Sequence, residues 1–171
     1  MKHRTPWSAA LLCWLLCLAL LTACGGSPAE AGTAGSCTVS ISCATILDNL
    51  DQFNAAKADF VPDDGVILPE TELSFTEGET AFDLLQRVCR DNGISMESSW
   101  SPLYKTAYIE GIANLYEFDC GKLSGWMYSV NGEFPNYGCS GYTLQDGDVI
   151  CWVYTCDLGE DVGGGYAAGG E

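Results

Sequence analysis

The sequence is short of positive charge and of histidine. Seven lysine and arginine residues stand against 23 aspartate and glutamate residues, which gives a net charge of −16 at pH 7, and the single histidine is His3. A surface of this sign repels the phosphates of nucleic acids and of anionic lipids, so neither is expected as a partner. A serine or cysteine nucleophile also lacks its usual histidine base. The sequence therefore predicts a protein that is not an enzyme.

Metal-binding patterns are also scarce. The ten cysteines contain no C-x-x-C pair, so the spacings of zinc ribbons and zinc fingers are missing. Asp157, Glu160 and Asp161 could offer oxygen ligands to calcium, yet they lack the dense alternation of a calcium loop. We therefore predict no metal site and no resident cofactor.

Long apolar runs are limited to the chain start. After a short basic segment, residues 7–21 form one run whose length suits a signal-peptide core and falls short of the roughly 20 residues of a membrane-spanning helix. The run ends in Leu-Thr-Ala-Cys at residues 21–24, which resembles the lipobox of bacterial lipoproteins. We predict a signal peptide at residues 1–23 and an extracytoplasmic protein that is lipid-anchored to the cell membrane surface through Cys24. An ordinary signal peptide cleaved after Ala23 is the alternative.

Small residues without periodicity border the central part of the chain. Residues 25–35 and 163–171 are rich in glycine and alanine, which is typical of disordered spacers. We expect a flexible tether at residues 24–36, one compact domain at residues 37–162 and a flexible tail at residues 163–171. A domain of about 125 residues is long enough for a single hydrophobic core.

The first part of the domain alternates between extended and helical patterns. Residues 37–43 alternate with period two and predict a strand, and residues 44–53 carry apolar side chains at helical spacing. Residues 55–69 contain two prolines and suit a loop, and residues 70–75 predict a second strand.

The helix predicted from Thr80 to about Asn92 has the strongest local pattern. Thr80 and Asp83 form a capping box, and the apolar residues that follow recur on one helical face. Gly93 is well placed to end the helix.

The remaining sequence predicts strands. They are expected at residues 94–100, 107–112, 125–130 and 148–156, and Asn131-Gly132 is the preferred pair for a tight hairpin turn. One helix packed across a mixed sheet is the β-grasp arrangement, so the predicted fold class is α+β.

Two motifs carry a family resemblance. Residues 125–132 read GWMYSVNG, and residues 142–154 read YTLQDGDVICWVY. Together with residues 77–85 and 97–104, they resemble the transcobalamin-like C-terminal domain family of bacterial surface proteins, over about residues 37–162. The resemblance implies a β-grasp domain of the soluble ligand-binding kind, with cobalamin or another corrinoid as a candidate ligand.

The resemblance also implies how such a ligand would be held. In vertebrate cobalamin carriers, a related domain covers the corrinoid from one side and a separate helical domain holds the other side. We find no helical domain in this sequence and no histidine after the predicted processing site. Any corrinoid contact is therefore expected from packing and backbone hydrogen bonds.

Aromatic residues are concentrated between residues 100 and 154. Tyrosine and tryptophan dominate recognition surfaces, but they also fill cores. Core packing is the favoured interpretation for Trp126 and Trp152 in mid-strand, and recognition is favoured for aromatic residues near prolines in loops. The candidate ligand-binding residues are Trp100, Tyr104, Trp126, Tyr128, Asn131 and Tyr137.

The predicted function is that of a surface lipoprotein whose domain binds a soluble small molecule at this aromatic half. The alternative is a structural or adhesive module in which the same aromatic residues contact another protein or a glycan.

Seven cysteines follow Cys24, and outside the cytoplasm such residues are normally oxidised. Cys120 and Cys139 flank the segment that contains the hairpin turn, and bridged cysteines need Cα atoms within about 7 Å. We therefore predict a Cys120–Cys139 disulfide. Cys89, on the apolar face of the predicted helix, is expected to be a buried free thiol.

Overall fold

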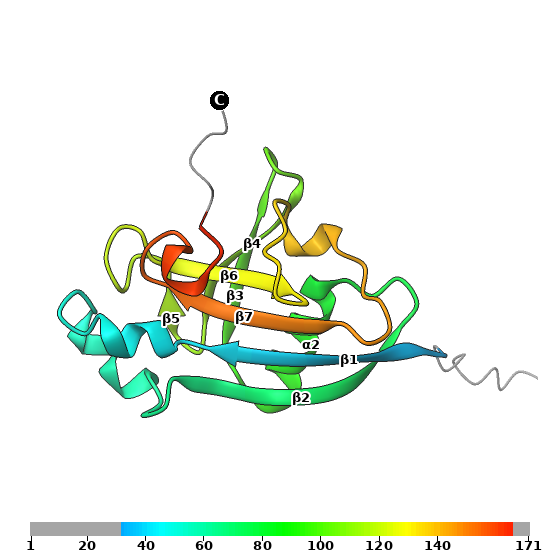
Figure 1. Cartoon of the computed structure of the whole chain (residues 1–171), viewed down its shortest axis with the longest axis horizontal. Coiled ribbons are helices and arrows are strands. Elements are labelled where there is room, and N and C mark those ends of the chain that lie inside the picture. The colour runs from blue at the N-terminus through cyan, green and yellow to red at the C-terminus, as the bar shows by residue number, and fades with distance from the viewer. Residues whose placement is uncertain (1–31, 166–171) are drawn as a thin grey trace, which may run out of the picture. The chain divides into compact units, whose positions relative to one another are not determined.

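One α-helix and two β-sheets organise residues 32–165, the part of the chain that the computed structural model describes (Figure 1). Within those residues, no helix is long and apolar enough to cross a membrane. The predicted signal peptide, Cys24 and the outer parts of the predicted tether and tail lie outside the described residues. The elements are β1 (Thr33–Ser42), β2 (Val66–Thr76), α2 (Ala81–Asn92), β3 (Met96–Ser101), β4 (Thr106–Ile112), β5 (Leu115–Tyr116), β6 (Gly125–Val130) and β7 (Val149–Thr155), with 3₁₀-helices at Ala44–Asp48, Ala55–Phe60, Cys139–Gly141 and Glu160–Val162.

The main sheet is mixed and has the strand order β2-β1-β7-β6. Its central strands β1 and β7 run parallel, whereas β2 pairs with β1 and β6 pairs with β7 in antiparallel fashion. The strands β3, β4 and β5 form a second, antiparallel sheet. The predicted α+β class, with one main helix and a mixed sheet, is confirmed, although the sequence did not indicate the division into two sheets.

Helix α2 forms as its sequence predicts. The Thr80 side chain accepts a hydrogen bond from the Asp83 backbone N–H, the Asp83 carboxylate accepts one from the Thr80 N–H, and Gly93 ends the helix with a φ of 67°. Its apolar face is buried in the main core cluster, together with residues of β1, β2, β4, β6 and β7; Figure 1 shows the helix behind the main sheet. The buried residues of this face are Ala81, Leu84, Leu85, Val88 and Cys89.

The start of the domain differs from the prediction. Strand β1 begins at Thr33, so the last four residues of the predicted tether belong to the main sheet, where the Ser36 N–H donates to Asp146 Oδ1 at 2.8 Å. The predicted helix at residues 44–53 is only a 3₁₀-helix at Ala44–Asp48. Phe53 is instead paired with Cys120 by an isolated β-bridge, which holds the chain extended at that point.

Strand β2 is longer than predicted because a proline is tolerated in it. The strand runs through Pro69, which the sequence assigned to a loop, and the predicted loop also holds the 3₁₀-helix at Ala55–Phe60. Strand β2 lies at the edge of its sheet, and its register with β1 shifts between Val39 and Ile41, opposite Thr71 and Leu68. An edge position with a shifted register can accept a residue that lacks a backbone N–H.

The hairpin turn lies where the sequence predicts it, and the Cys120–Cys139 disulfide stays a prediction. Asn131 and Gly132 both have positive φ, yet the turn is followed by only one bridge, Val130 to Glu133, and β6 then pairs with β7. Cys120 lies in a separate small core cluster, with its Sγ 3.5 Å from the Asn49 carbonyl oxygen, while Cys139 packs in the main core. All seven cysteines of the described residues are free thiols, including the buried Cys89.

Candidate functional site

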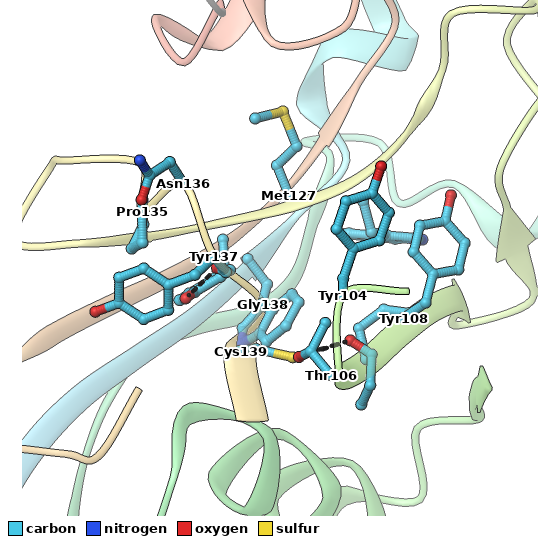
Figure 2. Close-up of a pocket in the computed structure, with 14 residues that line it drawn as sticks. Tyr104, Thr106, Tyr108, Met127, Pro135, Asn136, Tyr137, Gly138 and Cys139 are labelled. Atoms are coloured by element: carbon cyan, nitrogen blue, oxygen red, sulfur yellow. Dashed lines mark hydrogen bonds between the residues drawn. The ribbon is translucent and has the colours of Figure 1, made fainter. Parts of the chain in front are cut away.

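A cavity of about 680 Å³ lies where β4, β6 and the segment 135–139 meet. Figure 2 shows Tyr104 and Tyr108 on one side of it, and Pro135, Asn136 and Tyr137 on the other. Most of the lining side chains are aromatic or apolar. The lining residues are Tyr104, Thr106, Ala107, Tyr108, Ile109, Trp126, Met127, Tyr128, Pro135, Asn136, Tyr137, Gly138, Cys139 and Trp152.

The buried part of the pocket consists of fixed aromatic rings. Tyr128 and Trp152 stack with their ring centroids 5.4 Å apart, and the Tyr128 hydroxyl donates to the Tyr137 carbonyl oxygen at 2.9 Å. Trp126 packs edge-on against Tyr154 at 5.3 Å and donates from Nε1 to a backbone carbonyl oxygen at 2.8 Å. These contacts hold the rings in place without a ligand, so this part of the pocket is preformed.

The outer part of the pocket keeps three tyrosines in contact with solvent. Tyr104 is 76% exposed, Tyr137 is 51% exposed and Tyr108 is 46% exposed. Removing a large aromatic side chain from water lowers the free energy by roughly 25 cal/mol per Å² of apolar surface. The tyrosines therefore offer apolar area that a bound molecule could cover.

The segment 135–139 is attached closely to β4. The Ser140 hydroxyl oxygen lies 2.7 Å from Thr106 Oγ1 and accepts a hydrogen bond from the Ala107 N–H at 3.0 Å. A Cβ atom at Gly138 would overlap the Thr106 side chain. The glycine thus permits the close approach that forms one wall of the pocket, and Cys139 packs against the Ala107 carbonyl oxygen beside it.

The pocket carries no formal charge at neutral pH. None of its lining residues is lysine, arginine, aspartate or glutamate. Burial, together with a hydrogen bond to Glu117, raises the pKa of Tyr108 to about 12, and burial raises the pKa of the Cys139 thiol to about 11. Because the chain as a whole is strongly acidic, the site suits an uncharged or cationic molecule better than an anion.

Four of the six predicted binding residues line this pocket, and two do not. Tyr104, Trp126, Tyr128 and Tyr137 come together from β6 and two loops, although they are up to 33 positions apart in the sequence.

Trp100 lies on β3 outside the pocket and is 61% exposed. Asn131 serves the hairpin turn, because its side chain bonds Asp148 Oδ1 at 2.9 Å and accepts from the Val149 N–H at 2.8 Å. Tyr108 and Met127 were not among the predicted binding residues, and core packing was the favoured interpretation for Trp152, which also lines the pocket. The signal available in the sequence was the position of Tyr108 between the apolar residues Ala107 and Ile109, on the opposite face of the predicted strand.

Residues 32–165 contain no group of three or more histidine, cysteine, aspartate or glutamate side chains that could hold a metal ion. The Asp161 carboxylate accepts hydrogen bonds from the Thr155 hydroxyl and from the Cys156 N–H. This carboxylate therefore ties the chain after β7 to the end of that strand.

Two solved structures are similar to this chain at low sequence identity. A Ruminococcus gnavus protein for which metal binding has been suggested is similar at 17% identity, with 71% of this chain and 96% of that chain covered and a TM-score of 0.39. Haptocorrin in complex with Cbi is similar at 16% identity, over 74% of this chain but only 27% of haptocorrin, with a TM-score of 0.47. No curated protein matches the sequence.

The family match covers the segment from just before α2 to just after β7. Residues 78–156 match the family described as a domain of unknown function, DUF4430. The segment contains both motifs on which the family resemblance rests, so the predicted family is confirmed for these residues. It also contains every residue that lines the aromatic pocket. The match of this chain to DUF4430 over residues 78–156 thus includes the whole candidate site.

Proposed function

We propose that this protein binds a soluble, uncharged or cationic small molecule in the aromatic pocket and has no catalytic role. The observation that carries the proposal is a preformed, largely apolar cavity of about 680 Å³ with exposed tyrosines beside it. Ligand sites in proteins typically occupy about 300–1,000 Å³ and combine apolar walls with a few polar groups. A corrinoid is the first candidate, because of the transcobalamin-like resemblance of residues 125–132 and 142–154.

The proposal includes anchoring at the outer surface of the membrane. The lipobox-like residues 21–24 would place two acyl chains on Cys24, which suffices for durable attachment. Cys24→Ala is expected to release the protein into the medium or to leave it unprocessed. A variant that stays processed and membrane-bound, with no acyl mass on Cys24 of the wild-type protein, would contradict the anchor.

Ligand binding is tested by titration of the purified protein with cobalamin and with cobinamide. Saturable heat and a change in corrinoid absorption are expected, and Tyr137→Ala should weaken binding about tenfold because it removes a wall of the pocket. Trp100→Ala is the matched control, since this exposed aromatic lies outside the pocket. No heat and no spectral change at millimolar ligand would reject a corrinoid as the ligand.

Adhesion to a protein or a glycan is the second candidate. The observation that favours it is the tip of the β3–β4 hairpin, where Trp100, Leu103 and Tyr104 are 61%, 80% and 76% exposed. If this surface carries the function, Leu103→Ala should reduce adhesion of cells that display the protein. Substitutions deep in the pocket should leave that adhesion unchanged.

A further inference from the structure

Two cysteines, Cys120 and Cys156, lie at the same end of the β6–β7 ladder. The last pair of the ladder is Gly125 with Thr155, so Cys156 is the first residue beyond it. On the other strand, Ser124 directly precedes Gly125, and its hydroxyl oxygen accepts a hydrogen bond from the Cys120 N–H at 3.0 Å. This contact folds the chain before β6 back on itself, which brings Cys120 to the end of the ladder as well.

The side chains of both cysteines belong to one small core cluster. Cys120 is fully buried in this cluster, and Cys156 packs against it from a partly exposed position. Tyr154, another member, donates from its hydroxyl to Ser124 Oγ at 2.9 Å. The Ser124 oxygen therefore connects the Cys120 backbone with the strand that leads into Cys156. Cys120 Sγ also lies 3.5 Å from the Asn49 carbonyl oxygen, and Asn49 and Cys156 line one cavity of about 280 Å³.

The acidity of the two thiols agrees with this placement, and the other cysteines are placed differently. Burial raises both pKa values, that of Cys156 to about 12, and each thiol also affects the pKa of the other. Cys43, in the same cluster, lies at the turn of Gly65, to whose carbonyl oxygen its N–H donates at 2.7 Å. The cysteines of the main core cluster are Cys37, Cys89 and Cys139.

We propose that Cys120 and Cys156 are joined by a disulfide in the exported protein. Two S–H bonds break and one S–S bond forms, while two electrons and two protons pass to a disulfide oxidant, which becomes two thiols. The inference rests on the extracytoplasmic location included in the proposed function, because disulfides persist in oxidising compartments. It gives Cys120 a different partner from Cys139, which lies in the other core cluster.

The bridge closes a loop that carries most of the aromatic pocket. Nine of the fourteen lining residues lie between residues 120 and 156, on β6, on β7 and in the segment 135–139. Joining the two ends of this loop restricts the unfolded chain and keeps the start of β6 beside the end of β7. Neither cysteine lines the pocket, so the expected effect of the bridge is on stability.

A disulfide map of the full chain tests the pairing. The reduced, unfolded protein is refolded in a glutathione redox buffer, because the raised pKa of Cys156 leaves little reactive thiolate once the chain has folded. Free thiols are alkylated, and trypsin and chymotrypsin then cut between the cysteines at Lys122, Tyr142 and Tyr154. We expect one peptide pair that links Cys120 to Cys156. Alkylation of both residues, or linkage of either one to any other cysteine, would overturn the proposal.

Thermal unfolding with and without reductant gives a second measurement. Reductant should lower the Tm of the wild type by on the order of 10 °C, since the bridge closes a loop of about 35 residues. Cys156→Ser should already unfold at a lower temperature without reductant, and most of its response to reductant should be gone. Cys151→Ser is the matched control, because Cys151 is a partly exposed cysteine of β7 that belongs to neither core cluster. It should keep the full response.

An equal response to reductant in wild type and Cys156→Ser would overturn the proposal. Both measurements use purified protein without ligand. They therefore decide the disulfide even if the pocket binds no corrinoid or if Cys24 carries no lipid.

Discussion

The helix side of the main sheet and the aromatic pocket use apolar residues in opposite ways. On the helix side, the five buried residues of α2 belong to the main core cluster and leave no large side chain of that face in water. In the pocket, Tyr104, Tyr108 and Tyr137 keep between 46% and 76% of their surface exposed. The apolar side chains of α2 are buried by the chain itself, whereas the exposed surface of the pocket tyrosines could be buried only by another molecule. The predictions below test that difference.

The largest expected effect is on the helix side. Leu84 is fully buried, so Leu84→Ala should lower the free energy of unfolding by about 2–5 kcal/mol through lost burial and a residual cavity. Leu103→Ala removes the same atoms at an 80% exposed position and should change stability by less than about 0.5 kcal/mol. Urea unfolding of both variants measures the contrast. Similar losses for the two leucines would remove the basis of the comparison.

A smaller loss of stability is expected from a substitution at Gly138 in the wall of the pocket. Gly138→Ala would press a methyl group against Thr106 and should cost about 1–3 kcal/mol, together with a clear loss of ligand affinity. The matched control is Gly141→Ala, because a methyl group there would meet the Tyr137 ring at an ordinary contact distance of 3.5 Å. Calorimetric unfolding and ligand titration report the two effects. Unchanged binding by Gly138→Ala would show that this wall does not shape the site.

Capping of α2 is the next test. The Thr80 side chain accepts from the Asp83 N–H, so Thr80→Ala should destabilise the protein by about 1 kcal/mol. Thr80→Ser keeps the hydroxyl and should recover most of that loss. Neither variant should alter ligand affinity, since α2 supplies no lining residue. A change in affinity without a change in stability would mean that the two regions are coupled.

Alkaline pH should lower the free energy of unfolding by an amount similar to, or smaller than, the effect of Thr80→Ala. Burial raises the pKa of the Cys89 thiol from 9.0 to about 11, so the folded state holds this proton more tightly than the unfolded state. The stabilisation is complete below pH 9 and is lost as the pH rises towards 11, by on the order of 1 kcal/mol. Cys89→Ala has no such proton, and its stability should fall less between pH 9 and pH 11. Equal slopes for both proteins in chemical unfolding would contradict the prediction.

The sequence predicts these two regions unequally well, for physical reasons. Helix α2 depends on local interactions, namely the capping box of Thr80 and Asp83, apolar residues three and four positions apart, and a glycine at Gly93. All of these are visible in a short window of sequence. The pocket depends on β4 of one sheet meeting β6 of the other, and such pairing between distant segments leaves no local pattern.

The individual errors follow from the same distinction. Asn131 was correctly placed in a turn, but its side-chain partners Asp148 and Val149 come from a distant segment. Cys120 and Cys139 flank one hairpin in the sequence, whereas in the structure they lie in separate core clusters. Trp152 was assigned to the core, and only the assembled structure reveals that its ring also lines the pocket and that its N–H is unpaired.

The central claim is that the aromatic pocket, and no other aromatic surface of the domain, is the ligand site. Calorimetric titration of cobinamide into wild type, Tyr137→Ala and Trp100→Ala, side by side, tests it most directly. The account predicts saturable binding by wild type, about tenfold weaker binding by Tyr137→Ala and unchanged binding by Trp100→Ala. Binding that is lost in Trp100→Ala and kept in Tyr137→Ala would contradict it.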